Sequence, residues 1–440
     1  MDRTLMARLV EWKNSPRRKP LILNGARQVG KTWLLKEFGK AQFANVAYIN
    51  LDQNVRMQEQ FDLGYDIPRL ISAFQFATGE RIVEGETLII LDEIQECPKA
   101  LTSLKYFCED APGYAVAAAG SLLGITIHSG TGYPVGKVDT LDMYPMGFGE
   151  FLVATGNTNM AELIAYDDPS MIDSFASKLI PLLRQYYYVG GMPEAVAAFL
   201  NHSMLEDARA VQEQILRGYE LDISKHLTRV ESEYAIAAWK SISQHLSLQN
   251  KKFVFGHIAE GARARNYQSG ITWLEQAGLV TRVRRISKPG LPLCPYADDT
   301  AFKLFMVDVG LLGAMVHLDK DTVIGGSDIF TEFKGALAEQ YVCQQLVSEC
   351  GLTPYYWSAE NSTGEIDFLV QHDNRVVAIE VKAEENLRAK SLRAFKDKRP
   401  DVNALRFSMS GYREQDWMRN VPLYAMANTS LWGNIQTPMA

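Results

Sequence analysis

The sequence predicts an α/β protein whose first third is a three-layer P-loop nucleotide-binding core. Residues 25–32 match the pattern G-x-x-x-x-G-K-[ST], and an apolar run at residues 87–91 ends in two carboxylates. Around these two sites, further apolar runs of strand length alternate with stretches of helical spacing; the runs are residues 21–24, 46–50, 114–118 and 140–144. Such alternation is typical of a parallel sheet covered by helices.

The motif at residues 25–32 lies between an apolar run and a stretch of helical spacing, at a strand-to-helix turn. There the backbone N–H groups of the loop and the helix N-terminus can bind phosphate. We expect Lys31 to neutralise the β- and γ-phosphates of ATP and the Thr32 hydroxyl to bind Mg²⁺. The predicted nucleotide-binding residues are the motif and the residue after it: Gly25, Ala26, Arg27, Gln28, Val29, Gly30, Lys31, Thr32 and Trp33.

The second site is the pair Asp92 and Glu93, at the end of the apolar run. Ligand sites lie at the carboxyl ends of parallel strands, so both side chains should project toward the P-loop. We expect Asp92 to hold Mg²⁺ and Glu93 to orient the attacking water. The alternative is that the two acids only begin a helix. Ser121, after the next apolar run, is a candidate γ-phosphate sensor or else a serine that ends a strand.

Length and composition limit the class of protein. The chain has 440 residues, of which 47% are hydrophobic, enough for about three domains with cores of their own. Five scattered cysteines without a C-x-x-C pair favour neither a disulfide framework nor a zinc site, so we expect a reducing, cytoplasmic setting. The longest uncharged segment, residues 111–136, is broken by proline and glycine, and we expect no membrane span. With a net charge of −7, contact with nucleic acid requires a local basic patch.

The order of the motifs resembles the prokaryotic AAA+-type ATPases that carry a C-terminal domain of unknown function. The resemblance extends over nearly the whole chain. It rests on residues 25–32, 91–95, 120–121, 144–146, 150–152, 190–196, 308–312, 335–339 and 380–382. We therefore expect an AAA+-like core that hydrolyses ATP with Mg²⁺, a helical lid and assembly into a homo-oligomer.

Two further site residues follow from this resemblance. Many family members have a Gly-Arg pair where this chain has Gly136 and Lys137, so Lys137 is a candidate for contact with the γ-phosphate of a neighbouring subunit. The alternative is a solvated loop lysine. Residues 190–196 are similar to the turn that packs a helical lid onto nucleotide, which makes Pro193 a candidate nucleotide contact. The alternative is a helix-to-helix turn in which Pro193 starts the next helix.

The segment from residue 234 to residue 286 predicts a winged helix-turn-helix, because helical stretches end at Gly278 and a strand-like run follows. Around its end, six basic residues accompany a single acid, Glu275; they are Arg263, Arg265, Arg282, Arg284, Arg285 and Lys288. We expect this patch to contact the phosphate backbone of DNA. The alternative is a docking or lid module without DNA contact.

The C-terminal segment is similar to nucleases of the restriction-endonuclease fold. Glu380 and Lys382 are two residues apart on a predicted strand and so share one face, and a hairpin turn can bring Asp367 beside them. We expect Asp367 and Glu380 to bind a divalent metal, Glu339 to complete its shell and Lys382 to assist cleavage. The alternative is a solvent-facing Glu and Lys pair on an edge strand.

These observations predict a P-loop core at residues 1–152, a helical lid at 153–230, a winged-helix module at 231–320 and a nuclease-like α/β domain at 325–440. The expected function is ATP-driven handling of DNA. Two alternatives remain open. One is a nucleotide-controlled signalling or defence switch whose C-terminal domain docks a partner, and the other is an ATP-regulated nuclease.

Overall fold

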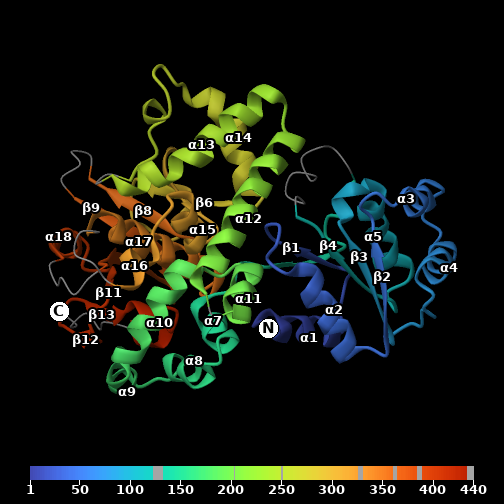
Figure 1. Ribbon diagram of the computed structural model, residues 1–440, viewed down its shortest axis with the longest axis horizontal. Helices are drawn as coiled ribbons and strands as arrows, with labels where there is room; N and C mark the ends of the chain where they lie inside the picture. The colour runs from blue at the N-terminus through green and yellow to red at the C-terminus, as the bar shows by residue number, and fades with distance from the viewer. Residues whose placement is uncertain are drawn as a thin grey trace. The chain divides into compact units, whose positions relative to one another are not determined.

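The computed structural model describes residues 1–121, 132–202, 204–248, 251–325, 331–359, 364–383 and 389–433. The chain divides into two compact units (Figure 1). The first comprises residues 1–144 and 276–279, and the second comprises residues 145–275 and 280–440.

The first unit contains a five-stranded parallel sheet in the order β2-β3-β4-β1-β5. Its strands are β1 (Leu21–Asn24), β2 (Asn45–Asn50), β3 (Thr87–Asp92), β4 (Ala115–Ala119) and β5 (Asp139–Asp142). Every residue of β3 is buried, as expected of a strand covered on both faces. Because β1 and β3 flank β4, the loops that follow β1, β3 and β4 lie at one carboxyl edge.

Helices cover both faces of this sheet (Figure 1). On one face, Ile89 and Leu91 of β3 join Phe107 in a continuous apolar core formed with α3 (Val55–Asp62), α4 (Ile67–Thr78) and α5 (Pro98–Asp110). On the other face lies α2 (Lys31–Gln42), where Gly39 allows close approach to Val46 and Leu88. Helix α1 (Leu5–Asn14) packs on α2 through Trp12 and Phe38. The predicted α/β P-loop core is confirmed.

The second unit begins with helices and contains an eight-stranded mixed sheet. The helices before the sheet are α7 (Phe148–Ala154), α8 (Thr158–Ile164), α9 (Pro169–Ser174), α10 (Ala176–Val189), α11 (Pro193–His202), α12 (Leu205–His226), α13 (Arg229–Ser247) and α14 (Ala264–Gln276). Later helices are α15 (Val309–Met315), α16 (Lys320–Ile324), α17 (Thr331–Ser348) and α18 (Lys390–Lys398). The mixture of helices and strands agrees with the predicted α/β class.

The sheet has the order β12-β13-β11-β10-β9-β8-β6-β7. Its strands are β6 (Val280–Ile286), β7 (Ala297–Met306), β8 (Tyr355–Ser358), β9 (Glu365–His372), β10 (Arg375–Val381), β11 (Asn403–Ser408), β12 (Arg413–Glu414) and β13 (Arg419–Pro422). The hairpin of β6 and β7 joins the C-terminal strands, because β6 pairs in parallel with β8. The segment expected to form a winged helix thus shares a sheet with the C-terminal segment.

Candidate functional site

The P-loop has the backbone geometry that its glycines require. Gly25 has a φ of +145°, and a side-chain carbon there would lie 2.2 Å from the carbonyl oxygen of Met143. Gly30, immediately before α2, has a φ of 97°. Only glycine adopts such angles without strain, so these two positions shape the loop around the start of the helix.

Lys31 is buried at the first position of α2, and its ammonium group lies inside the loop. Its Nζ atom donates hydrogen bonds to the carbonyl oxygens of Gly25 at 2.8 Å and Ala26 at 2.7 Å. Burial lowers the pKa of Lys31 to about 8, while the carboxylates of Glu93 and Asp92 oppose that shift. A phosphate in the loop would add negative charge and favour the protonated ammonium further.

Thr32 and Asp92 meet at the expected magnesium site. The Thr32 hydroxyl donates to Oδ2 of Asp92 at 2.9 Å, and the Tyr48 hydroxyl donates to the same oxygen at 2.8 Å. Asp92 is only 4% exposed at the end of β3. A buried carboxylate beside a hydroxyl is a hard-oxygen donor pair that fits Mg²⁺. Sequence reasoning missed Tyr48, since a tyrosine within a strand has no motif around it.

Glu93 follows β3 in a left-handed conformation, with φ 51° and ψ 44°. Such angles are uncommon for a residue other than glycine and tend to occur at functional sites. Its N–H donates to Oδ1 of Asp92 at 3.2 Å, and its carboxylate accepts a hydrogen bond from the Gln95 side chain. The turn therefore fixes the Glu93 backbone against Asp92, while Gln95 holds the Glu93 carboxylate.

Two of the other predicted residues of this unit, Ser121 and Lys137, have identified partners. Arg27 of the P-loop donates from Nε to the Ser121 hydroxyl at 3.2 Å, so the candidate sensor contacts the phosphate-binding loop. Lys137 forms an ion pair with Glu109 of α5 at 2.8 Å, and both side chains are partly exposed. This exposed ion pair favours the alternative in which Lys137 is a solvated loop lysine over contact with the γ-phosphate of a neighbouring subunit. Trp33 is 44% exposed on α2.

Arg3 is a second residue that sequence reasoning missed. It is buried, and its guanidinium donates to the carbonyl oxygens of Val29 at 2.9 Å and Tyr144 at 2.7 Å. One side chain thus ties the P-loop to the segment after β5. Arginine suits this position because its planar fork can bond two acceptors at once. No local pattern near the start of the chain signals this contact.

The predicted lid turn is held by a buried carboxylate of the second unit. The Gly191 N–H donates to Oδ2 of Asp308 at 2.6 Å, and a side-chain carbon at Gly190 would lie 2.2 Å from Oδ1 of the same residue. Gln344 also donates to Asp308. Burial raises the pKa of Asp308, and these donors oppose that shift. Pro193 begins α11, as the helix-start alternative expects.

The basic patch is largely neutralised by acidic partners. Arg282 is buried and pairs with Glu275 at 3.1 Å; Arg284 pairs with Glu275 and with Asp299, the latter at 2.8 Å. Arg285 pairs with Asp298 at 2.6 Å. The sequence predicted one acid, Glu275, beside six basic residues. That prediction is wrong, because β7 also brings Asp298 and Asp299 alongside β6. Three basic side chains of the patch are exposed: Arg263, Arg265 and Lys288.

In the C-terminal sheet, the predicted acidic residues lie near one another. Glu380 of β10 and Lys382, which directly follows β10, form an ion pair of 2.7 Å, so their side chains lie on one side of the backbone, as the alternation predicts. Asp367 on β9 accepts a hydrogen bond from the Val381 N–H at 2.8 Å. Burial and, to a smaller extent, the nearby carboxylate of Glu339 raise the pKa of Asp367 to about 7. The edge-strand alternative is wrong, because β10 lies between β9 and β11 and Glu380 is buried.

Two more lysines join this cluster. Lys251 forms an ion pair with Glu339, and Lys303 forms one with Glu365. Burial lowers the pKa of Lys303, but the carboxylates of Glu365, Glu339 and Asp367 outweigh burial and leave the pKa raised. Within the described residues, no group of three or more acidic, histidine or cysteine side chains is arranged to hold a metal ion. The expected metal ligands therefore do not fit a metal ion, because the carboxylates of Glu339 and Glu380 already form ion pairs with lysines.

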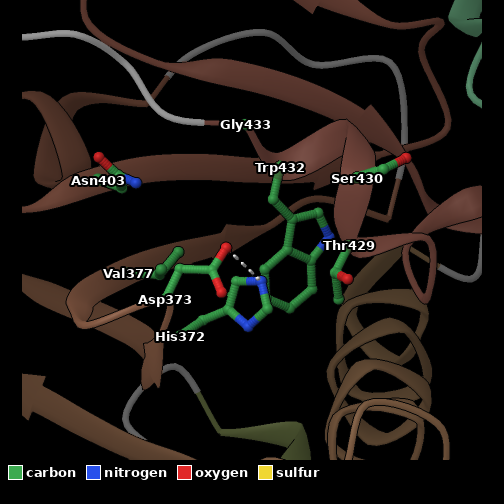
Figure 2. Close-up of a pocket in the computed structure, with 8 residues that line it drawn as sticks. All are labelled: His372, Asp373, Val377, Asn403, Thr429, Ser430, Trp432 and Gly433. Atoms are coloured by element: carbon green, nitrogen blue, oxygen red, sulfur yellow. Dashed lines mark ion pairs between the residues drawn. The ribbon is translucent and has the colours of Figure 1, made fainter.

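A small polar cavity of about 120 Å³ lies elsewhere in this unit, beside the β9–β10 hairpin. Figure 2 shows the ring of His372 next to the indole of Trp432, with Asp373 paired to the imidazole. Thr429, Ser430 and Asn403 contribute further polar groups. None of the predicted catalytic residues lines this cavity, and we assign it no chemistry.

Among the residues that the structure describes, no helix has both the length and the apolar character needed to cross a bilayer.

Comparison with known proteins assigns the three parts of the chain. Residues 17–152 match a family model described as an AAA domain. Residues 180–322 match a domain of unknown function (DUF8612), and residues 334–426 match another domain of unknown function (DUF4143). No protein with curated annotation matches the chain.

Several solved structures are similar at low identity. A Walker-type ATPase of Pyrococcus abyssi is 14% identical with a TM-score of 0.42, over 72% of this chain and 95% of that one. The Orc1 protein of Aeropyrum pernix, solved in complex with DNA, is 13% identical with a TM-score of 0.28, over 71% and 91% of the two chains. RuvB of Thermotoga maritima, a Holliday junction branch migration motor, is 15% identical with a TM-score of 0.26, over 62% and 85%. The family models and the P-loop geometry identify an AAA-type P-loop ATPase domain, followed in this chain by two domains of unknown function.

Proposed function

We propose that this protein hydrolyses ATP with Mg²⁺ and uses the reaction to act on DNA. The observation that carries the ATPase part is the direct hydrogen bond between Thr32 and Asp92. It joins the phosphate-binding loop to the acidic end of β3, the two parts that phosphoryl transfer in P-loop proteins requires.

Each residue of this site has a distinct role in the proposed reaction. Lys31 neutralises phosphate charge, and the backbone of the loop holds the phosphates in place. Thr32 and Asp92 would hold Mg²⁺, which supplies charge neutralisation at the phosphate oxygens. Glu93 accepts a hydrogen bond from the attacking water and orients it. Ser121, in contact with Arg27, would register whether the terminal phosphate is present.

The DNA part of the proposal depends on a smaller basic surface than the sequence suggests. Arg263, Arg265 and Lys288 are exposed, whereas the three arginines of β6 have acidic partners. Exposed cations of this kind contact phosphates without reading base sequence. Binding to DNA should therefore be weak, insensitive to sequence and strongly salt-dependent.

An ATPase assay with and without DNA tests the proposal. Turnover should rise several-fold on addition of single-stranded, duplex or branched DNA, and the stimulation should fall as salt increases. Equal turnover with and without every DNA, together with slow nucleotide release, would favour the signalling or defence switch instead. Absence of any hydrolysis would contradict the ATPase assignment itself.

A second candidate function is a metal-dependent nuclease in the C-terminal sheet. It is supported by the proximity of Asp367, Glu339, Glu380 and Lys382 in a buried cluster. The test is cleavage of DNA by the full chain with Mg²⁺ or Mn²⁺. Lys382→Ala should stop cleavage and leave metal binding intact, whereas Asp367→Ala should abolish both. If neither metal binds, even with DNA present, this domain is better regarded as a docking module.

A further inference from the structure

Arg27 of the P-loop is tied to the end of the central strand of its sheet. Its Nε atom donates a hydrogen bond of 3.2 Å to the hydroxyl of Ser121. Ser121 is 5% exposed and follows β4, which lies between β1 and β3. In a P-loop ATPase the γ-phosphate lies between the loop after β1 and the acidic end of β3. A γ-phosphate in this site would therefore lie beside the end of β4, where Arg27 meets Ser121.

The charges that act on Lys31 indicate why a second cation is needed in this site. Burial lowers the pKa of Lys31, the carboxylates of Glu93 and Asp92 oppose that shift, and the charge of Arg27 adds to it. Without Arg27, one ammonium would share the site with two carboxylates. Their net negative charge would oppose the binding of ATP with Mg²⁺, which is itself negatively charged. Arg27 brings this set of four side chains to neutrality.

Arg27 also has the chemistry that contact with phosphate requires. A guanidinium is always charged and can bond two phosphate oxygens at once. Lys137, the candidate for contact with the γ-phosphate of a neighbouring subunit, instead forms an ion pair of 2.8 Å with Glu109 on α5. The ammonium of a lysine also lacks the planar fork of arginine. Position and chemistry thus favour Arg27 over Lys137 at the γ-phosphate.

We propose that Arg27 is a catalytic arginine that contacts the γ-phosphate of ATP within its own subunit, and that Ser121 is a positioning residue that orients its guanidinium. This role rests on the proposed ATPase function. In hydrolysis, the oxygen of water bonds to the γ-phosphorus, the bond from that phosphorus to the bridging oxygen breaks, and its electron pair stays on ADP. One water proton remains on the released phosphate, and the other passes to solvent. Arg27 stabilises the negative charge of the phosphate oxygens during this transfer.

Hydrolysis and equilibrium binding of ATP and ADP by full-chain variants test the role of Arg27. Arg27→Ala should lower kcat roughly 100-fold or more, since loss of one group that stabilises the transition state costs on the order of 10² to 10³ in rate. ATP should bind about ten-fold more weakly and ADP about equally, because ADP has no γ-phosphate. Arg27→Lys should recover only a small part of the rate. Arg56→Ala, which removes an exposed arginine of α3, is the control and should change none of these values.

A double-mutant cycle tests the positioning role of Ser121. Ser121→Ala should lower kcat about ten-fold in the native background and leave the affinity for ADP unchanged. In the Arg27→Ala background it should have no further effect, because Ser121 acts through Arg27. Equal losses in the two backgrounds would overturn this role.

Mixing two inactive variants separates action within one subunit from action on a neighbour. Lys31→Ala lacks the phosphate-binding ammonium but keeps Arg27, whereas Arg27→Ala keeps Lys31. If Arg27 acts in its own subunit, the mixture should hydrolyse ATP no faster than the sum of the two variants. Recovered turnover would place Arg27 in the site of a neighbouring subunit and overturn the assignment.

The outcomes also distinguish failure of this role from failure of the proposed function. If the native protein and Arg27→Ala hydrolyse ATP equally fast, Arg27 is not catalytic although the ATPase function stands. If the native protein does not hydrolyse ATP, the ATPase function fails and the role of Arg27 fails with it. Binding of ADP by Arg27→Ala shows that the variant folds. Should it not fold, Arg27→Lys decides, since native turnover in that variant would overturn the role.

Discussion

The hydroxyl of Thr32 lies 2.9 Å from the carboxylate of Asp92, although the two residues are 60 positions apart in the chain. The contact exists because β1 and β3 are parallel strands on either side of β4, with their carboxyl ends at one edge. Tyr48, on β2 beside β3, adds a second donor to the same oxygen. Helix α2 and strands β2 and β3 thus contribute side chains to one corner of the nucleotide site, and the first three predictions concern it.

Lys31→Ala should abolish nucleotide binding or lower turnover at least roughly 100-fold, because the ammonium is the principal positive charge of the loop. Lys40→Ala is the matched control, since Lys40 lies on the same helix and pairs with Glu37 at the surface. Binding of a fluorescent ATP analogue and steady-state hydrolysis measure the two effects. Native turnover in Lys31→Ala would remove this loop from the reaction.

Glu93→Gln should keep ATP bound but slow hydrolysis by roughly 100-fold or more, since it preserves Thr32 and Asp92 and removes only the water-orienting carboxylate. Retention of radiolabelled ATP on the variant after gel filtration, compared with the native protein, is the measurement. Hydrolysis at the native rate would show that another group activates the water.

Tyr48→Phe should reduce turnover by about five-fold, which corresponds to about 1 kcal/mol for one lost hydrogen bond to Asp92. The loss should be greatest at low Mg²⁺, because Tyr48 acts by positioning the Asp92 carboxylate. Tyr114→Phe, another partly buried tyrosine of this unit, serves as control. A rate loss that is the same at every Mg²⁺ concentration would argue for a general structural effect.

Replacing Arg263, Arg265 and Lys288 together by glutamine should weaken DNA binding for all sequences alike. The slope of log K against log salt should flatten by up to roughly three units, since each phosphate contact contributes about 0.9. The triple variant of Arg282, Arg284 and Arg285 should instead lower thermal stability, because it removes the arginine partners of Glu275, Asp298 and Asp299. Unchanged salt dependence in the first variant would exclude this surface as the DNA site.

Stability should fall with rising pH because of Asp367. Its pKa in the folded chain is about 7, above the ordinary value of 3.8, so the folded state binds a proton that the unfolded state releases. The stabilising contribution is full below pH 4 and is lost as pH rises through about 7. Between pH 5 and pH 8, native protein should lose on the order of 2 kcal/mol relative to Asp367→Asn. Urea unfolding of both proteins with a chelator measures this difference, and parallel pH profiles would mean that Asp367 titrates as an ordinary aspartate.

Local patterns in the sequence were sufficient to predict the nucleotide site. The P-loop and the acidic end of β3 are contiguous motifs, and their spacing along alternating strands and helices specifies a shared sheet edge. Strand alternation likewise predicted that Glu380 and Lys382 share a face. In each case the side chains concerned are near neighbours in sequence or follow parallel strands of one sheet, so backbone geometry alone brings them together.

The tertiary structure decided which charges meet, because a charge is neutralised by whatever packs against it and not by its neighbours in the chain. Asp298 neutralises Arg285 only because β7 runs antiparallel to β6 and places the two residues opposite each other. The arginines of β6 therefore belong to an ion-paired hairpin and do not form an open basic patch. Lys251 and Glu339 are 88 positions apart and belong to segments expected to form different domains. Arg3 likewise contacts Val29 through tertiary packing, since the two residues are 26 positions apart in the chain. Sequence by itself thus determined the phosphate-binding chemistry, whereas long-range packing determined which basic and acidic groups remain available to DNA or a metal.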